Sequence, residues 1–376
     1  MLPSEKDHYY MRLALREARK GMGRTSPNPC VGAVIVRDQE IVGTGYHKKA
    51  GTPHAEIHAL RQAGALAAGA TLYVTLEPCN HTGRTPPCTK AIATSGIRRV
   101  VVGMQDPNPL VDGGGNSYLQ DQGIEVVSGV LEAECRAQNR PFLKYVTQSL
   151  PWVVMKAGMS LDGRISYQPD QSGQMTGAAS LRKVHRLRDR VDAILVGNAT
   201  VLVDDPALTT RLPHGSGRDP VRIVLDTHLQ IPESARLLHL DSSALTWIFC
   251  GTEVSLEKME RIRKAGNVVI YQVECGADGR IDLLQMLKIL VSKGITSVLV
   301  EGGATIHSAF LREQLVDHVN LFIAPIFAGN SGVSVIEGLN ILGGEDVIRL
   351  HNVCYRRLGQ DMMVAGDVVY GNFLKS

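Results

Sequence analysis

Hydrophobic and polar residues alternate along the chain with two periods, one typical of helices and one typical of strands. Apolar residues spaced three and four apart predict an amphipathic helix over Asp7–Lys20. The apolar runs Val31–Val36 and Ile41–His47 predict two strands joined as a hairpin by the polar residues 37–40. Further helices are expected at His54–Gln62, from Cys88, at Asn116–Gln122 and at Leu131–Thr147, and further strands at Ala70–Leu76, Arg99–Met104 and Ile124–Gly129. This alternation predicts an α/β layer architecture.

A short polar stretch that ends in Pro151 predicts a boundary between two domains, residues 1–148 and 149–376. The alternation resumes beyond it, so the second domain is also expected to be α/β. Its helices are expected at Ser180–Asp192, Asp282–Lys293 and Ala304–Leu315, and its strands at Trp152–Ala157, Ala193–Gly197, Val221–Asp226, Leu245–Cys250, Val268–Val273, Ser297–Glu301 and His318–Pro325. No internal repeat relates the two halves, so we expect two different folds.

Composition and charge exclude several classes of protein. With 376 residues, 44% of them hydrophobic, the chain is long enough for two packed cores and too apolar for a disordered protein. There are 17 basic and 13 acidic residues up to Gln148 and 23 and 24 beyond it, which argues against nucleic-acid binding. No apolar run is long enough to span a membrane, and residues 1–20 lack a signal-peptide core. Seven cysteines, an odd number, do not suggest a disulfide framework, so we expect a cytoplasmic protein.

The most specific motif is His54-Ala55-Glu56, followed by Pro78-Cys79 and Pro87-Cys88. One imidazole and two thiolates give zinc three protein ligands and leave the fourth position for water, which the ion acidifies into a nucleophile. Glu56 lies two residues after the histidine and could carry a proton from that water to a leaving amine. Zinc deaminases use the same set of groups. Cys88 is expected at a helix N-terminus, where the helix dipole favours a thiolate.

Less specific interpretations compete with this one. His54 and His58 have the spacing of a metalloprotease pair, but Ala55 stands where that motif needs its glutamate. Single buried cysteines are usually inert, and we assign the other five to that class. Asn28, His81 and Arg84 are polar residues that could hold a ring and a phosphate near the metal. Asn-Pro and Thr-Gly-Arg are equally ordinary turn sequences, so both interpretations of these three residues stand.

Motifs in the second half are weaker. Strand Ser297–Glu301 is followed by Gly302-Gly303 and a helix, a turn that could present backbone N–H groups to a pyrophosphate. By itself this signal is weak, and an ordinary strand–helix turn that needs positive φ is the more usual explanation of the glycines. The basic helix Ser180–Asp192 could face a phosphate, although such runs are more often solvated surfaces. The loop Ser160–Arg164 follows a strand and lies at a sheet edge where α/β proteins bind ligands.

The motifs of the first half resemble the cytidine and deoxycytidylate deaminase superfamily, except that eight residues rather than two separate the cysteines. The longer loop 77–88 resembles one branch, the bifunctional deaminase–reductase (RibD) family of riboflavin biosynthesis. Pro27–Gly32 and Asp106–Pro109 match that branch too. The resemblance implies a cytidine-deaminase-like α/β/α N-terminal domain, with zinc bound by His54, Cys79 and Cys88 and with Glu56 as the catalytic proton shuttle.

The resemblance extends over the second half, through the segments Lys156–Arg164, Gly197–Thr209 and Glu301–Gly303. It implies a dihydrofolate-reductase-like α/β C-terminal domain that uses NADPH. The implied cofactor contacts are Gly158, Gln174, Thr200, Asp204, Gly302 and Gly303. The implied substrate contacts, beside Asn28, His81 and Arg84 in the first half, are Lys156, Ser172, Arg188, Leu208, Arg211 and Glu301. Gln174 departs from the family, which often has a tryptophan there, and this puts a stacking contact in doubt.

These features together predict a bifunctional enzyme with one zinc ion per chain. Its first domain would hydrolytically deaminate 2,5-diamino-6-(5-phosphoribosylamino)pyrimidin-4(3H)-one, and its second would reduce the ribosyl group to ribityl with NADPH. We expect a homo-oligomer, a dimer or a tetramer, with no nucleic-acid or membrane partner. Two other functions stay open. They are a deaminase of another nucleotide or of RNA, and a zinc-stabilised binding module, for which a fourth metal ligand would be expected.

Overall fold

The computed structural model describes residues 3–81, 86–108, 114–171, 173–213, 215 and 217–371. The chain divides into two compact units, Met1–Leu150 and Pro151–Ser376. The boundary expected after residue 148 lies two residues before the observed one. Within the described residues, none of the helices is both long and apolar enough to cross a membrane.

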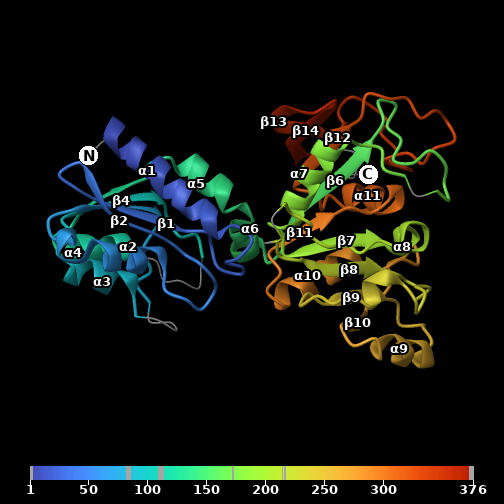
Figure 1. Ribbon diagram of the computed structural model, residues 1–376, viewed down its shortest axis with the longest axis horizontal. Helices are drawn as coiled ribbons and strands as arrows, with labels where there is room; N and C mark the ends of the chain where they lie inside the picture. The colour runs from blue at the N-terminus through green and yellow to red at the C-terminus, as the bar shows by residue number, and fades with distance from the viewer. Residues whose placement is uncertain are drawn as a thin grey trace. The chain divides into compact units, whose positions relative to one another are not determined.

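The first unit is a three-layer α/β/α structure around a five-stranded sheet (Figure 1). The strand order is β2-β1-β3-β4-β5, in which β2, β1 and β3 pair antiparallel and β3, β4 and β5 pair parallel. Helices α1 and α5 lie on one face, and α2, α3 and α4 on the other (Figure 1). The strands are β1 (Gly32–Arg37), β2 (Glu40–Tyr46), β3 (Thr71–Leu76), β4 (Arg99–Met104) and β5 (Glu125–Ser128). The helices are α1 (Glu5–Ala18), α2 (Ala55–Ala63), α3 (Cys88–Thr94), α4 (Gly115–Asp121), α5 (Glu132–Gln138) and α6 (Arg140–Gln148).

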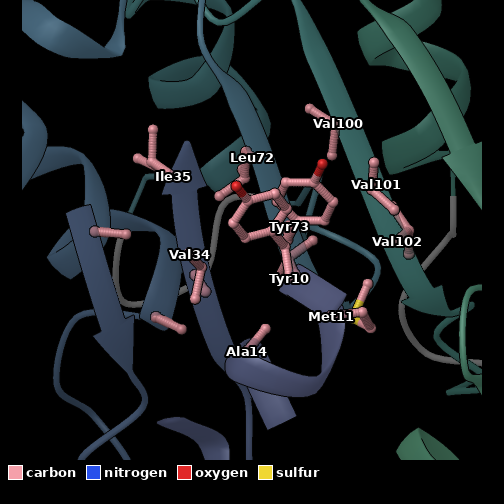
Figure 2. Close-up of a cluster of buried hydrophobic side chains, with 14 of the residues drawn as sticks. Tyr10, Met11, Ala14, Val34, Ile35, Leu72, Tyr73, Val100, Val101 and Val102 are labelled. Carbon is pink, nitrogen blue, oxygen red and sulfur yellow. The ribbon is translucent and has the colours of Figure 1, made fainter. Parts of the chain in front are cut away.

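The core of this unit forms where α1 packs on the central strands. Tyr10, Met11 and Ala14 of α1 lie against Val34 of β1 and Tyr73 of β3 (Figure 2). The apolar spacing of α1 and the β-branched runs of the strands therefore meet as the sequence pattern predicts.

The second unit contains a nine-stranded sheet of order β10-β9-β8-β7-β11-β6-β12-β14-β13. All neighbouring strands are parallel except at one end, where β14 pairs antiparallel with both β12 and β13. The strands are β6 (Trp152–Met159), β7 (Ala193–Gly197), β8 (Val221–Leu225), β9 (Thr246–Cys250), β10 (Val268–Gln272), β11 (Ser297–Val300), β12 (His318–Ile323), β13 (Arg349–Leu358) and β14 (Asp361–Val369). The helices are α7 (Ala178–Arg188), α8 (Asn198–Asp204), α9 (Leu256–Arg263), α10 (Leu283–Ser292) and α11 (Ala304–Arg312).

The structure corrects the sequence-based elements at several places. The single helix expected over Leu131–Thr147 is two helices, α5 and α6, because the chain breaks at Asn139, whose side chain bonds to the Cys30 backbone. The hairpin β13–β14 was not expected, because most residues of β13 are exposed and it lacks an apolar alternation. The short helices α8 and α9 were also not expected.

Candidate functional site

Three side chains predicted to bind metal meet in the first unit. His54 Nδ1 lies 3.5 Å from Cys79 Sγ and 3.3 Å from Cys88 Sγ, and the three ligand atoms all lie within 4.8 Å of one another. A tetrahedral zinc ion bound to one nitrogen and two sulfurs needs ligand separations of about 3.6 Å. No fourth histidine, cysteine or carboxylate joins this group among the described residues. The donor set therefore fits a zinc ion with one coordination position open.

Local structure explains how these ligands come together. His54 is the N-cap of α2 and has an extended backbone, and Cys88 is the first residue of α3, directly after Pro87. The N-terminus of α2 approaches β2 closely because Gly45 has no side chain. A Cβ atom there would lie 2.2 Å from the carbonyl oxygen of Ala55. The backbone N–H of Cys88 donates to Cys79 Sγ at 3.4 Å. Hydrogen bonds from Cys88 and His54 lower the pKa of Cys79, which favours the thiolate that zinc requires.

Glu56 lies beside this group in a cavity of about 190 Å³. Its side chain is only 3% exposed, and burial raises its pKa although His54 opposes the shift. A buried carboxyl group with a raised pKa can both accept and release a proton, as a shuttle must. Asn28 and His81 line the same cavity, so the structure places together all but one of the residues predicted for this site. The exception is Arg84, which lies outside the described residues.

Five other polar or aromatic residues of this cavity were not predicted as site residues. They are His47, Glu77, Asp106, Asn108 and Phe142. Glu77 and Asp106 follow the carboxyl ends of the adjacent parallel strands β3 and β4. The rule that α/β sheets bind ligands at this edge would have identified both. His47 ends a strand pattern and Phe142 lies in a helix, so neither had a recognisable sequence signal.

The second unit holds a cavity of about 260 Å³ built around Glu301. The Glu301 carboxylate accepts hydrogen bonds from Arg188 Nε at 2.9 Å, from Arg188 Nη2 at 2.8 Å and from Lys156 Nζ at 3.3 Å. Burial alone would raise the pKa of Glu301, but the charges of Arg188 and Lys156 lower it well below its ordinary value. The cavity therefore contains a carboxylate that two neighbouring cations hold in its charged form.

Most residues predicted for the second half line this cavity. They are Lys156, Gly158, Gln174, Arg188, Thr200, Asp204, Leu208, Glu301, Gly302 and Gly303. Arg211 is exposed and is not among the lining residues, although its backbone N–H donates to His185 Nδ1 of α7 at 3.2 Å. Ser172 lies outside the described residues. The Gln174 side chain donates to the carbonyl oxygen of Thr176 at 2.9 Å, which is a turn contact rather than a stacking surface.

The glycine pair after β11 does not need positive φ, contrary to the simpler sequence interpretation. Gly303 is the N-cap of α11 with φ −70° and ψ −176°, and Gly302 is not among the glycines with positive φ. A Cβ atom on Gly302 would instead lie 2.8 Å from the Cβ atom of Ile306. Close packing of the turn on α11 therefore requires this glycine.

A further cavity of about 360 Å³ lies next to α8 in the second unit. Gly197 and Asn198 line it from the start of α8, while Thr200 and Asp204 of the same helix line the Glu301 cavity. Arg280 and His228 also line it, and neither was predicted from the sequence as a site residue. Helix α8 therefore contributes residues to two cavities.

Two family models match the chain, one in each half. The cytidine and deoxycytidylate deaminase zinc-binding region matches residues 4–104, which include all three metal ligands. The RibD C-terminal domain matches residues 151–364, which include Lys156, Arg188 and Glu301. The matches fall in the same two units that the structure separates.

Curated relatives match nearly the full length. The riboflavin biosynthesis protein RibD of Bacillus amyloliquefaciens is 41% identical over 97% of this chain and 100% of its own length. RibD of Aquifex aeolicus is 43% identical over 96% of this chain and 98% of its own length. The solved structure of Acinetobacter baumannii RibD superposes with a TM-score of 0.86 at 35% identity, covering 97% of this chain and 99% of that one.

A Thermotoga maritima protein described as a diaminohydroxyphosphoribosylaminopyrimidine deaminase/5-amino-6-(5-phosphoribosylamino)uracil reductase superposes with a TM-score of 0.83 at 35% identity. This match covers 96% of this chain and 99% of the Thermotoga chain. The paired family models, the full-length relatives and the metal-ligand geometry agree, and the chain belongs to the RibD family of riboflavin biosynthesis proteins.

Proposed function

We propose that this chain catalyses two consecutive steps of riboflavin biosynthesis, one in each unit. The first unit would deaminate 2,5-diamino-6-(5-phosphoribosylamino)pyrimidin-4(3H)-one, and the second would reduce the ribosyl group of the product to ribityl. The observation that carries the proposal is the meeting of His54, Cys79 and Cys88 beside the buried Glu56. We assign residues 1–148 to the deaminase and 149–376 to the reductase, and the positions of the two cavities support this assignment.

In the first unit, His54, Cys79 and Cys88 would hold zinc, which when bound acidifies a water molecule for attack on the ring carbon. Glu56 accepts a proton from the water and delivers it to the departing amino group, so that water and the amine become a carbonyl and ammonia. Its burial keeps it shielded from bulk solvent. Asn28 and His81 contact the pyrimidine ribotide from the cavity wall, and Arg84 is assigned to the phosphate.

In the second unit, the residues that line the Glu301 cavity would hold NADPH, which when bound would supply the hydride that reduces C1′ of the ring-opened sugar. Gly158, Gln174, Thr200, Asp204, Gly302 and Gly303 are the proposed cofactor contacts. Lys156 Nζ donates one hydrogen bond to Glu301, and its remaining ammonium protons are the proposed donors to sugar oxygen atoms. Arg188 also bonds to the carbonyl oxygen of Thr209 at 3.1 Å, which fixes it at the cavity wall. Ser172, Leu208 and Arg211 are the remaining proposed substrate contacts.

The proposal is tested by replacing Glu56 with glutamine, which keeps the shape of the side chain but cannot accept the proton. We expect Glu56→Gln to lower the deamination rate by about 10²-fold or more. Zinc content should stay at the wild-type level, because the three ligands are intact. The NADPH-dependent reduction of supplied 5-amino-6-(5-phosphoribosylamino)uracil should be unchanged. Ammonia release and NADPH absorbance measure the two activities in the same sample.

Deoxycytidylate is the matched control substrate, since the first family model covers deaminases that act on it. Full-rate deamination by Glu56→Gln would exclude the role given to Glu56. Deamination of deoxycytidylate in preference to the diaminopyrimidine ribotide would exclude the proposed substrate. A zinc-loaded wild-type protein with neither activity would support a zinc-stabilised binding module instead.

We also propose that the protein is a homodimer formed through the edge strand β13. This strand is ten residues long and lies at the end of the sheet, with no neighbour on its outer side in the part of the chain described. Tyr355 on it is 69% exposed. An edge strand presents unpaired backbone N–H and C=O groups with which a strand of another chain can pair. Light scattering should give the mass of two chains for the wild type and of one for Tyr355→Lys. An unchanged mass would exclude this edge.

A cytoplasmic setting belongs to the same proposal. Cys79 and Cys88 bind zinc only as reduced thiolates, and neither forms a disulfide bond in the structure.

A further inference from the structure

Asn139 is not among the residues that line the Glu56 cavity, but it bonds to the loop that places Asn28 in that cavity. It lies between α5 and α6 with φ −107° and ψ 17°, and its side chain is buried. Its Oδ1 accepts a hydrogen bond from the N–H of Cys30 at 2.8 Å, and its Nδ2 donates to the carbonyl oxygen of Cys30 at 3.1 Å. One side-chain amide thus satisfies both backbone groups of Cys30, as a neighbouring strand would.

Asn28 is held from its other side by His47. The His47 Nδ1 atom lies 3.3 Å from the carbonyl oxygen of Pro53, which can only accept, so the neutral imidazole carries its proton on Nδ1. His47 Nε2 is then an acceptor, and it lies 3.2 Å from Asn28 Nδ2. This contact directs the amide nitrogen to His47. It leaves Oδ1 of Asn28 as the oxygen that a ligand in the cavity can use.

We propose that Asn139 is a positioning residue for the deamination. By holding Cys30, two residues after Asn28, it keeps the Asn28 oxygen where it accepts a hydrogen bond from an N–H group of the pyrimidine. Phe142, which lines the same cavity from α6, lies three residues after Asn139 in the chain. The inference rests on the proposed deaminase function, because it needs an N–H-bearing ring in this cavity.

The test is a double-mutant cycle between Asn139→Ala and Asn28→Ala, with the diaminopyrimidine ribotide as substrate. Each single variant should raise the KM for deamination about tenfold, which corresponds to the loss of one hydrogen bond to the ring. In the Asn28→Ala protein, adding Asn139→Ala should raise KM less than about twofold, because both changes remove the same contact. Asn139→Asp, which keeps the acceptor for Cys30 N–H but loses the donor, should give an intermediate KM.

Leu119→Ala is the control for a purely structural effect, since Leu119 is fully buried in the core of the same unit and is not among the residues that line the Glu56 cavity. It should lower the melting temperature while leaving KM unchanged. Zinc content and the reductase rate should stay at wild-type values in every variant. If Asn139→Ala does not fold, the double-mutant cycle is measured with Asn139→Asp and Asn28→Ala instead.

The outcomes separate this inference from the proposed function. A wild-type enzyme that does not deaminate the ribotide contradicts the proposed function itself. A wild-type enzyme that does, together with Asn139 variants whose KM is unchanged, overturns the positioning role. The positioning role is also overturned if the double variant raises KM by the product of the two single-variant factors.

Discussion

Glu301 is a buried carboxylate in the second unit, and the two cations Arg188 and Lys156 stabilise its charged form. Its side chain is 6% exposed, while those of Arg188 and Lys156 are 12% and 18% exposed. Removing one member of a buried ion pair leaves the opposite charge without a partner, which typically lowers the free energy of unfolding by about 3–5 kcal/mol. We therefore expect Glu301→Gln to lower the free energy of unfolding of the second unit by about that amount at pH 7.

The difference in unfolding free energy between wild type and Glu301→Gln depends on pH, and the sign of this dependence follows from the pKa of Glu301. The pKa of Glu301 in the folded protein lies below its ordinary value of 4.5. A group with a depressed pKa contributes stability above its unfolded pKa and loses it as the pH falls towards the folded pKa. The difference between wild type and Glu301→Gln should therefore be constant from pH 7 to pH 6 and shrink below about pH 4.5. Both tryptophans, Trp152 and Trp247, belong to the second unit. Urea unfolding followed by tryptophan fluorescence therefore measures the free energy of unfolding of this unit in both proteins.

At the level of elements, the metal site depends on how closely α2 approaches β2. A side chain at Gly45 would collide with the backbone of Ala55, the first residue of α2, and would displace the helix that places His54 and Glu56. We expect Gly45→Ala to destabilise the first unit by about 1–3 kcal/mol and to lower its zinc content.

Gly343→Ala is the matched control, because a Cβ atom at Gly343 meets nothing within 4 Å and its φ is not positive. Zinc determined after gel filtration and calorimetric melting check both variants. A Gly45→Ala protein with full zinc and wild-type melting would contradict the close-approach argument.

The sequence pattern predicted helices and strands well where the apolar periodicity is strong. It predicted them poorly where contacts with residues distant in sequence determine where an element ends. The buried strands β3, β4, β7 and β9 were expected within one residue of their observed bounds, because strands that are buried on both faces are continuous apolar runs. The break at Asn139 was missed because its cause, Cys30, lies 109 residues away. The zinc ligands were identifiable because thiolate and imidazole spacing is chemically specific, whereas His47 and Phe142 join the cavity only through folding.

At the level of the whole molecule, the two units have separate hydrophobic cores and separate cavities. Zinc binds only the folded first unit with high affinity, so its removal should destabilise that unit alone. We expect a chelator to lower the melting temperature of one calorimetric transition. The tryptophan-detected unfolding midpoint, which reports the second unit, should not move. A shift of both transitions by the same amount would show that the units unfold together.

The glycine pair at the start of α11 has a consequence for how natural variation in this family should be interpreted. Selection for packing alone would retain glycine at 302, because any side chain there would overlap Ile306. Gly303 is under no such constraint, since a Cβ atom there would meet only Thr200 Oγ1, at 3.9 Å, and its φ suits any residue. Glycine retained at 303 across diverged homologues would therefore record selection by the ligand, while glycine at 302 records selection by the fold.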